Sequence, residues 1–487
     1  MKKIISPALL FILVTAVSFS LFAQSPEKSE SKSVLKYFIT KSGTKLMDGP
    51  DEYRFMGLAA SNLHQNEDQV RQDVSNRFPD EFESRDALTT FKQMGGRATR
   101  IFSFTIRQQG TNLPYYIDSL GGYNPDAFKS LDKTIQLCNE LGIRLIIPII
   151  DSHDFYGVGG IKQFAGFRGK SASEFWTDRQ VISDFKQMVT DILNHKNVYT
   201  GVAYKDEKAI LAWQLGNELE TFIWDYKRNP DEWFPILLTW QKEISAFLRT
   251  AAPNHLIMDG GAGRGEDVAQ DPNIDIISKH YYIHWSGEKD VYKFNKADKA
   301  MTNRYNKVLI ADEFGLGPTS SLTALMDEIL ANGTSGGLLW GIRAHRRDGG
   351  FYDHEEGGGY RSYHWPGFPS GNFQDETNVL RLLREYAYKI RKMKPEPITA
   401  PLPPTLLPIV SGRISWQGST GASQYEIQRR PTGTTAWKTL APRVTDDRQP
   451  PLYTDTTAVI GTSFDYRVIA KNSAGSSLPS NIITAKE

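Results

Sequence analysis

Short apolar runs alternate with amphipathic stretches along most of the chain from residue 55 onward. Such runs, bounded by glycine, proline and polar residues, are typical of strands buried in a parallel sheet, and the stretches between them have the spacing of covering helices. Eight runs follow the strand pattern, at residues 55–59, 98–102, 144–150, 210–215, 256–259, 276–280, 307–311 and 337–340. These units, within residues 24–399, predict an α/β fold, a closed (β/α)8 TIM barrel whose active site lies where the strands end.

The stretch 174–195 illustrates the helical pattern. Its apolar residues, among them Phe175, Val181, Phe185 and Val189, recur at spacings that place most of them on one face of a helix. We expect one amphipathic helix here, with these residues in the core rather than in the site.

The pattern changes at residues 400–408, which contain four prolines. This composition favours a stiff, extended linker between domains. Beyond it, residues 413–416, 424–428 and 464–470 alternate apolar and polar positions between turn-forming residues. The alternation predicts a small all-β, immunoglobulin-like sandwich over residues 409–487. Residues 465–480, with Trp416 as the core tryptophan, resemble a fibronectin type III domain. We expect a spacer rather than a polysaccharide-binding module, because its strands show no evident row of exposed aromatic residues.

The first 23 residues have the layout of a secretory signal peptide. Lys2 and Lys3 precede an apolar stretch, residues 8–23, and polar residues follow it. A membrane anchor is the weaker alternative, because the stretch is shorter than the roughly 20 residues that span a bilayer. We therefore expect a secreted or periplasmic protein without a membrane anchor.

The net charge limits the class of ligand, and the cysteine count excludes a disulfide within the chain. The 57 basic and 56 acidic residues leave a net charge of +1, which gives no electrostatic basis for binding nucleic acid or an anionic membrane. The single cysteine, Cys138, has no partner for a disulfide. A neutral ligand fits this composition best.

Two glutamates stand at the ends of predicted strands. Glu218 ends the string WQLGNE after the fourth strand, and Glu313 ends VLIADE after the seventh. The carboxyl ends of all barrel strands meet at one face, so we expect the two side chains to lie close together. Paired carboxylates of this kind cleave glycosidic bonds by double displacement, in which one attacks the anomeric carbon and the other transfers a proton.

Five strand-end segments together resemble the retaining glycosidases of glycoside hydrolase family 5. The segments are ATRIF, WQLGNELE, SKHYY, LIADEFG and GGLLWG, and they carry Arg100, Asn217, Glu218, His280, Tyr282, Glu313 and Trp340. The resemblance extends over nearly the whole barrel. It implies that Glu218 is the general acid/base, that Glu313 is the nucleophile, and that no cofactor or metal is needed.

The resemblance also implies roles for the other residues. Asn217 donates to the sugar 2-hydroxyl, His280 orients Glu218 and Tyr282, and Trp340 offers a flat ring beneath the sugar. Two carboxylates roughly 5 Å apart repel, so one should stay protonated at neutral pH. We expect this to be Glu218, with Arg100 and Tyr282 stabilising the charge on Glu313.

Residues 175–220 resemble the endo-β-1,4-mannanase branch of the family. This implies an enzyme that cuts internal bonds of mannan, glucomannan or galactomannan. We also expect the protein to be a monomer. Another β-1,4-glycan hydrolase such as an endoglucanase, a transglycosylase, and a non-catalytic glycan-binding barrel remain alternatives.

Two further groups of residues are ambiguous. Several tryptophans in or near predicted loops suit either sugar stacking or ordinary packing, namely Trp176, Trp224, Trp233, Trp285 and Trp365. Residues 151–157 and the His, Asp and Glu residues between His345 and Glu356 look superficially like metal ligands. Neither group has the spacing of a zinc or calcium motif.

Overall fold

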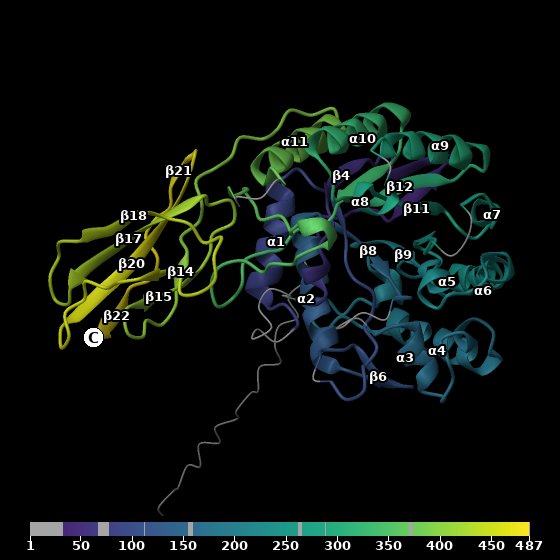
Figure 1. Ribbon diagram of the computed structural model, residues 1–487, viewed down its shortest axis with the longest axis horizontal. Helices are drawn as coiled ribbons and strands as arrows, with labels where there is room; N and C mark the ends of the chain where they lie inside the picture. Colours follow the sequence, from purple (N-terminus) through teal and green to yellow (C-terminus); the bar gives the residue numbers. More distant parts are fainter. Residues whose placement is uncertain are drawn as a thin grey trace, which may run out of the picture.

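The computed structural model describes residues 33–66, 77–111, 113–153, 159–261, 265–287, 289–369 and 374–486. A barrel takes up most of the chain, and a β-rich domain formed by the end of the chain lies beside helix α1 (Glu81–Gln93) (Figure 1). The predicted signal peptide, residues 1–23, falls outside the described residues. Within the described ranges, no helix combines the length and apolar character that crossing a bilayer requires.

Eight parallel strands form the central sheet, in the order β4-β13-β12-β11-β10-β9-β8-β5. They are β4 (Phe55–Leu58), β5 (Ala98–Arg100), β8 (Arg144–Pro148), β9 (Ile210–Gln214), β10 (Leu256–Met258), β11 (Ile276–Tyr282), β12 (Val308–Gly315) and β13 (Gly336–Leu339). Each predicted run overlaps one of them. The first and last strands of this order meet, because the Ala60 amide donates to the Arg100 carbonyl over 2.9 Å and the Thr99 hydroxyl to the Leu58 carbonyl over 2.8 Å. This is the architecture of the predicted (β/α)8 barrel.

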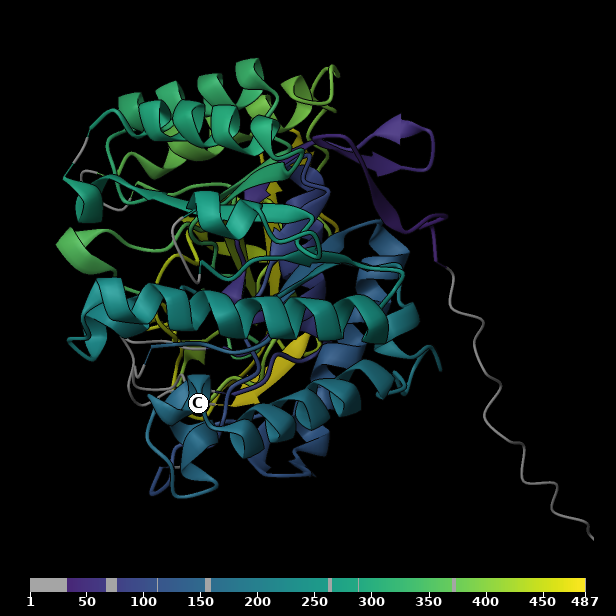
Figure 2. The ribbon, with the colours of Figure 1, turned by 90° about the vertical axis from the view of Figure 1, so that its right-hand side faces the viewer.

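Helices surround this sheet (Figure 2). The longer ones are α1, α2 (Pro125–Leu141), α4 (Arg179–Asn194), α6 (Pro230–Ala251), α9 (Val291–Arg304), α10 (Thr319–Asn332) and α11 (Glu376–Lys389). Short helices and turns in the connections are η1 (Ser61–Leu63), α3 (Ile161–Gly166), η2 (Glu174–Trp176), η3 (Tyr204–Asp206), α5 (Thr221–Asp225), α7 (Gly265–Ala269), α8 (Ile283–Ser286) and η4 (Gly357–Gly359). Local signals set their ends: α2 begins at Pro125 behind the capping side chain of Asn124, and Gly142, whose φ is 77°, terminates it after Leu141.

The single helix expected over residues 174–195 is wrong. The segment forms η2 and, separately, α4. The Asp178 side chain accepts from the amides of Gln180 and Val181, and an aspartate that binds these amides starts a new helix. Apolar spacing continues across the break, so periodicity alone did not reveal it.

The core has two layers. Alternate strand residues, such as Ile146, Ala212 and Ile310, fill the barrel interior. Ile39 and Leu46 join them from the antiparallel sheet of β1 (Ile39–Ser42), β2 (Lys45–Asp48) and β3 (Asp51–Glu52). The residues facing the other way pack against the helices. A small hairpin, β6 (Ile117–Ser119) with β7 (Gly122–Tyr123), projects from the connection after β5.

The chain after residue 404 is built from β-strands in its described part. These are β14 (Thr405–Leu406), β15 (Arg413–Ile414), β16 (Trp416–Gln417), β17 (Gln424–Pro431), β18 (Lys438–Val444), β19 (Tyr453–Thr454), β20 (Ser463–Asn472), β21 (Gly475–Ser476) and β22 (Ile483–Lys486). The linker expected at residues 400–408 is shorter than predicted, because β14 pairs with β16 and Leu406 is buried beside Trp416. Neither residue of β14 is a proline, so both keep the backbone N–H group that a strand can donate.

Candidate active site

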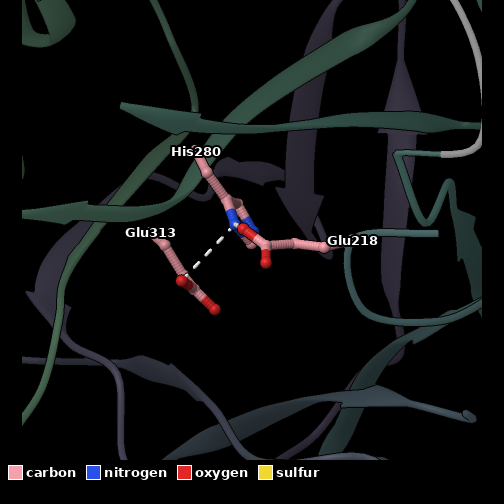
Figure 3. A group of neighbouring side chains, drawn as sticks. All are labelled: Glu218, His280 and Glu313. Carbon is pink, nitrogen blue, oxygen red and sulfur yellow. Dashed lines mark hydrogen bonds and ion pairs between the residues drawn. The ribbon is translucent and has the colours of Figure 1, made fainter. Parts of the chain in front are cut away.

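The side chains singled out from the sequence gather at the carboxyl ends of the barrel strands. Glu218 follows β9, Glu313 lies in β12, and His280 lies in β11 between them. Figure 3 shows these three side chains pointing toward one another. One carboxylate oxygen from each glutamate and a ring nitrogen of His280 all lie within 4.8 Å of one another. Enzymes that cleave a glycosidic bond by double displacement hold their two carboxyl groups roughly 5 Å apart, and the spacing here suits that chemistry.

A β-bulge in β12 shapes this site. Between the pairs Ser278–Ile310 and His280–Glu313, β12 contributes one residue more than β11. The same register shift occurs against β13. Neighbouring residues of a regular strand face opposite sides, yet Asp312 and Glu313 both contact Arg100, at 3.2 and 2.5 Å. The extra residue allows both carboxylates to face the same guanidinium, as bulges beside active sites commonly do.

Glu313 is held by two donors. Arg100 donates to its Oε1 over 2.5 Å, and the Tyr282 hydroxyl donates to its Oε2 over 2.5 Å. Burial raises the pKa of Glu313, and the charge of Glu218 adds to the rise, whereas His280, Arg100 and the Tyr282 hydrogen bond act against it. The two bonds fix the orientation of the carboxylate and stabilise its ionised form.

Glu218 lies between two imidazoles. Nδ1 of His280 is 2.6 Å from its Oε1, and Nε2 of His153 is 2.7 Å from its Oε2. Burial alone raises the pKa of this carboxyl, but the two histidines outweigh burial and hold the pKa below its usual range. Burial likewise disfavours the charge on His153, yet its hydrogen bond to Glu218 and the charges of Asp151 and Asp225 raise the pKa of this imidazole to about 9.

The order of the two carboxyl pKa values is therefore the reverse of the one expected from the sequence. That expectation considered the repulsion between Glu218 and Glu313 and the stabilisation of Glu313 by Arg100 and Tyr282, but no positive charge beside Glu218. In the structure two imidazoles contact Glu218. The pKa of His280 is also raised well above its usual value, because the charges of Glu313, Asp312 and Glu218 outweigh its burial. The two histidines bonded to Glu218 thus favour the ionised form of its carboxyl group.

Arg100 organises the middle of the site. Its side chain is 1% exposed, and besides Glu313 it donates to Gln214 over 2.7 Å and to Asn217 over 2.6 Å. Asn217 in turn donates from Nδ2 to Asp151 over 2.9 Å. Contacts at both ends of the Asn217 amide fix which way its oxygen and nitrogen face.

Trp340 follows β13 and is half-buried at the edge of the site. Its backbone amide donates to the Phe314 carbonyl over 2.8 Å, and its indole Nε1 donates to Glu356 over 2.6 Å. Phe102 contacts the ring edge-on, with centroids 5.7 Å apart. The indole is thus held in one orientation by a carboxylate from the loop after β13.

Several residues in this network were not singled out as site residues from the sequence. Asp312 and Gln214 bond each other over 3.0 Å, and both contact Arg100. His153 belongs to the loop after β8 that was considered as a metal-ligand candidate, of which residues 154–158 lie outside the described residues. Its place just after the third barrel strand was the available signal, since catalytic residues in this fold come from strand ends. Glu356 offered no comparable signal.

The tryptophans outside the strand ends differ in exposure. Trp224 in α5 is 57% exposed, whereas Trp176 and Trp365 are buried and Trp233 is partly buried against the core. The side chain of Trp285 is outside the described part of the structure. Stacking on a sugar requires an exposed ring face, which favours Trp224 over Trp176 and Trp365.

The donor atoms of Glu218, His280 and Glu313 have a spacing compatible with a metal ion. Their surroundings argue against a cation, because the Arg100 guanidinium and the two imidazoles already bring positive charge to these oxygens. Of the other residues considered as ligands, Asp353 pairs with Arg361 and Asp348 with Arg346. These bonds are internal to the loop.

Comparison with known proteins identifies a related family. Residues 88–317 match the model of GH family 5 beta-mannosidase-like proteins. The match begins in α1 and ends just beyond β12, so it includes the segments that carry Arg100, Glu218, His280 and Glu313.

Curated mannan endo-1,4-beta-mannosidases are similar in sequence to this chain. Mannan endo-1,4-beta-mannosidase 1 of Arabidopsis thaliana is 27% identical over 309 residues, which are 53% of this chain and 72% of the relative. Mannan endo-1,4-beta-mannosidase 1 of Oryza sativa is 29% identical over 223 residues, 40% of this chain and 49% of the relative. In several other relatives the matched region spans only 29% to 34% of their length.

Solved structures support the fold. The endo-1,4-beta-mannanase of Rhizomucor miehei aligns with a TM-score of 0.59 and 19% identity, over 73% of this chain and 99% of that one. At this identity the likeness shows a common barrel fold, and the chemistry is argued from the site.

Proposed function

We propose that the protein is a retaining endo-β-1,4-mannanase that hydrolyses internal bonds of mannan, glucomannan or galactomannan. The observation that carries the proposal is the approach of Glu218 and Glu313 oxygens within 4.8 Å at one end of the barrel. The match of residues 88–317 to GH family 5 beta-mannosidase-like proteins and the mannan endo-1,4-beta-mannosidases among the relatives support the substrate.

In the first step Glu313 attacks the anomeric carbon while Glu218 protonates the departing oxygen. Arg100 and Tyr282 keep the attacking carboxylate oriented through bonds of 2.5 Å each. Glu218 needs a proton at this moment, and His280 and His153 lie 2.6 and 2.7 Å from its oxygens. Either imidazolium can return the proton to Glu218 across these bonds as negative charge develops on the leaving group.

In the second step Glu218 acts as the base. Once Glu313 is bonded to the sugar it carries no charge, and Glu218 takes a proton from water that attacks the same carbon. Two inversions leave the anomeric configuration unchanged. Asn217, whose amide is oriented by Arg100 and Asp151, donates to the sugar 2-hydroxyl, and Trp340 supports the sugar face.

The remaining parts of the proposal concern the whole chain. Residues 1–23 direct the protein out of the cytoplasm, residues 24–399 form the catalytic domain, and the β-rich end is a fibronectin type III-like, immunoglobulin-like sandwich. The mature protein is a monomer that binds β-mannan polysaccharides and needs no cofactor. Buried positions recur between partly buried ones in β17 and β20, which supports the sandwich.

Parallel assays test the substrate. Reducing ends released from mannan, carboxymethyl cellulose and xylan are measured with the same enzyme preparation. We expect release from mannan to dominate. Activity on cellulose alone would make the protein an endoglucanase, and inactivity on all three polymers would favour a glycan-binding barrel.

Matched variants test the mechanism. Glu313→Gln and Glu218→Gln keep the side-chain shape and remove the charge. Loss of the proton shuttle costs about 10²- to 10⁴-fold in kcat, and loss of the nucleophile costs more because no glycosyl-enzyme forms. Glu266→Gln is the control, since this exposed glutamate in α7 pairs with Arg304 on the surface. NMR of the first product formed gives the stereochemistry, and an inverted anomer would refute the double displacement.

A further inference from the structure

Three buried polar side chains meet where the C-terminal domain contacts the barrel. His345, in the loop after β13, is 1% exposed. Its Nδ1 lies 2.9 Å from a carboxylate oxygen of Asp86 in α1, and its Nε2 lies 3.1 Å from Asp446 of the C-terminal domain. Asp86 and Asp446 are buried as well. One imidazole therefore joins the two parts of the chain without water access.

This bridge requires a charged imidazole. A ring with a carboxylate on each nitrogen donates from both, which only the protonated form can do. Burial disfavours that charge, but Asp86 and Asp446 raise the pKa of His345 to about 10. Phe351 stacks on the ring, with centroids 3.9 Å apart. Thr420 of the C-terminal domain donates to the other oxygen of Asp86, so Asp86 binds both the barrel loop and the C-terminal domain.

Glycines on both sides of the interface bring the backbones into close contact. A Cβ atom on Gly418 would lie 2.2 Å from the His345 ring, and one on Gly421 would lie 2.4 Å from Gln93 of α1. From the barrel side, a Cβ atom on Gly350 would lie 2.2 Å from the Arg448 carbonyl. The two surfaces leave no room for a methyl group at these points, which describes a fixed docking rather than a flexible tether.

The loop that carries His345 also reaches the active site. In residues 341–366, the Tyr352 amide donates to Ala344 over 3.2 Å, and the Tyr363 amide donates to Gly341 over 3.0 Å. Between Tyr352 and Tyr363, Glu356 accepts the indole N–H of Trp340 over 2.6 Å. His354 contacts the same Glu356 oxygen at 3.1 Å. The loop therefore contacts the interface bridge through His345 and the Trp340 indole through Glu356.

We propose that the C-terminal domain is a positioning element of the active site, in which the Asp86–His345–Asp446 bridge holds the loop 341–366 so that Glu356 orients the Trp340 indole. His345 and Asp446 act through the loop and not on the substrate. This goes beyond the spacer role expected from the sequence. The kinetic part of the inference rests on the proposed function, whereas the structural part does not depend on it.

Asp446→Ala in the full chain tests the inference. Backbone hydrogen exchange is measured for peptides from the loop 341–366 and from β12, and Michaelis parameters are measured on a soluble mannan oligosaccharide. We expect exchange in the loop to rise at least tenfold while β12 is unchanged. KM should rise more than kcat falls, because the sugar platform loosens while the two glutamates stay in place. Asp446→Asn keeps the shape and an acceptor oxygen, so both effects should be smaller in this variant than in Asp446→Ala. If Asp446→Ala does not fold, Asp446→Asn is compared with the wild-type protein in its place.

Asp465→Ala is the matched control. This aspartate is also buried in the C-terminal domain, but it pairs with Arg430 within that domain. Equal effects of the two alanine variants, exchange rising equally in β12, or no change in loop exchange would each overturn the inference. If the wild-type protein does not hydrolyse mannan, the proposed function fails alone, and loop exchange still decides whether the bridge holds the loop.

Discussion

Replacing Arg100 by lysine separates the geometry of its guanidinium from its charge. The arginine donates to Gln214, Glu313 and Asn217 over 2.7, 2.5 and 2.6 Å from three different nitrogens. A lysine keeps the positive charge but has one nitrogen, so it cannot donate in three directions from a planar fork. We predict that Arg100→Lys keeps a cation near Glu313 and releases at least two of the three partners.

The distances and burial set the size of the effect. Hydrogen bonds that involve a charged group contribute about 1.5 to 3 kcal/mol each, and water cannot replace them at a side chain that is 1% exposed. Losing two of them lowers the free energy of unfolding by about 3 to 6 kcal/mol. Loss of a preorganised electrostatic contact in an active site typically lowers kcat by about 10²- to 10³-fold, and we expect this range for kcat/KM on mannan oligosaccharides.

The control is Arg144→Lys. Arg144 is also 1% exposed, but it lies at the start of β8, where it donates to the Lys208 carbonyl over 2.6 Å and to Asp48 over 2.9 Å. It should lose about 1.5 to 3 kcal/mol of stability, for one bond, with kcat/KM almost unchanged. Denaturant unfolding and steady-state kinetics of both variants provide the comparison. An Arg100→Lys enzyme with wild-type kcat/KM, or an equal loss of activity in Arg144→Lys, would refute the role assigned to the fork.

Three further predictions follow from single contacts. Tyr282→Phe removes a hydrogen bond that lowers the pKa of Glu313, so the acid limb of the pH profile of kcat/KM should move to higher pH; an unmoved limb would contradict this. His153→Asn should lower the free energy of unfolding by about 3 kcal/mol at pH 6, because folding raises the pKa of this imidazole from 6.5 to about 9. The difference should disappear as the pH rises through 9. If denaturant unfolding gives the same difference at every pH, the stabilisation does not come from the charged imidazole. Gly336→Ala should lower stability by about 1 to 3 kcal/mol, because its Cβ would lie 2.3 Å from the Phe55 ring; an unchanged unfolding midpoint would argue against close packing there.

The barrel could be predicted because its signal is local. A strand such as β8, Arg144–Pro148, is buried throughout, and a short uninterrupted apolar run is the direct mark of such a strand. Helix ends depend on single residues rather than on the period. Asp178 divided the segment 174–195 although the apolar spacing continued across it.

The active site could be predicted only as far as strand ends and resemblance reached. Glu218 and Glu313 follow apolar runs, so their meeting is a consequence of the fold. In a regular strand, alternation would place Asp312 on the face opposite Glu313. Only the bulge in β12, which depends on the register against β11 and β13, brings both carboxylates to Arg100.

By itself, the sequence determined the architecture and the identity of the two glutamates at the strand ends. These properties follow from backbone period and from strand direction, which are local. The tertiary structure decided which groups shift the pKa of Glu218 and what holds Trp340. His153 reaches Glu218 across 65 residues and His345 reaches Asp446 across 101. Contacts between such distant residues depend on how strands and loops pack, and pKa values change only once the charges are brought together.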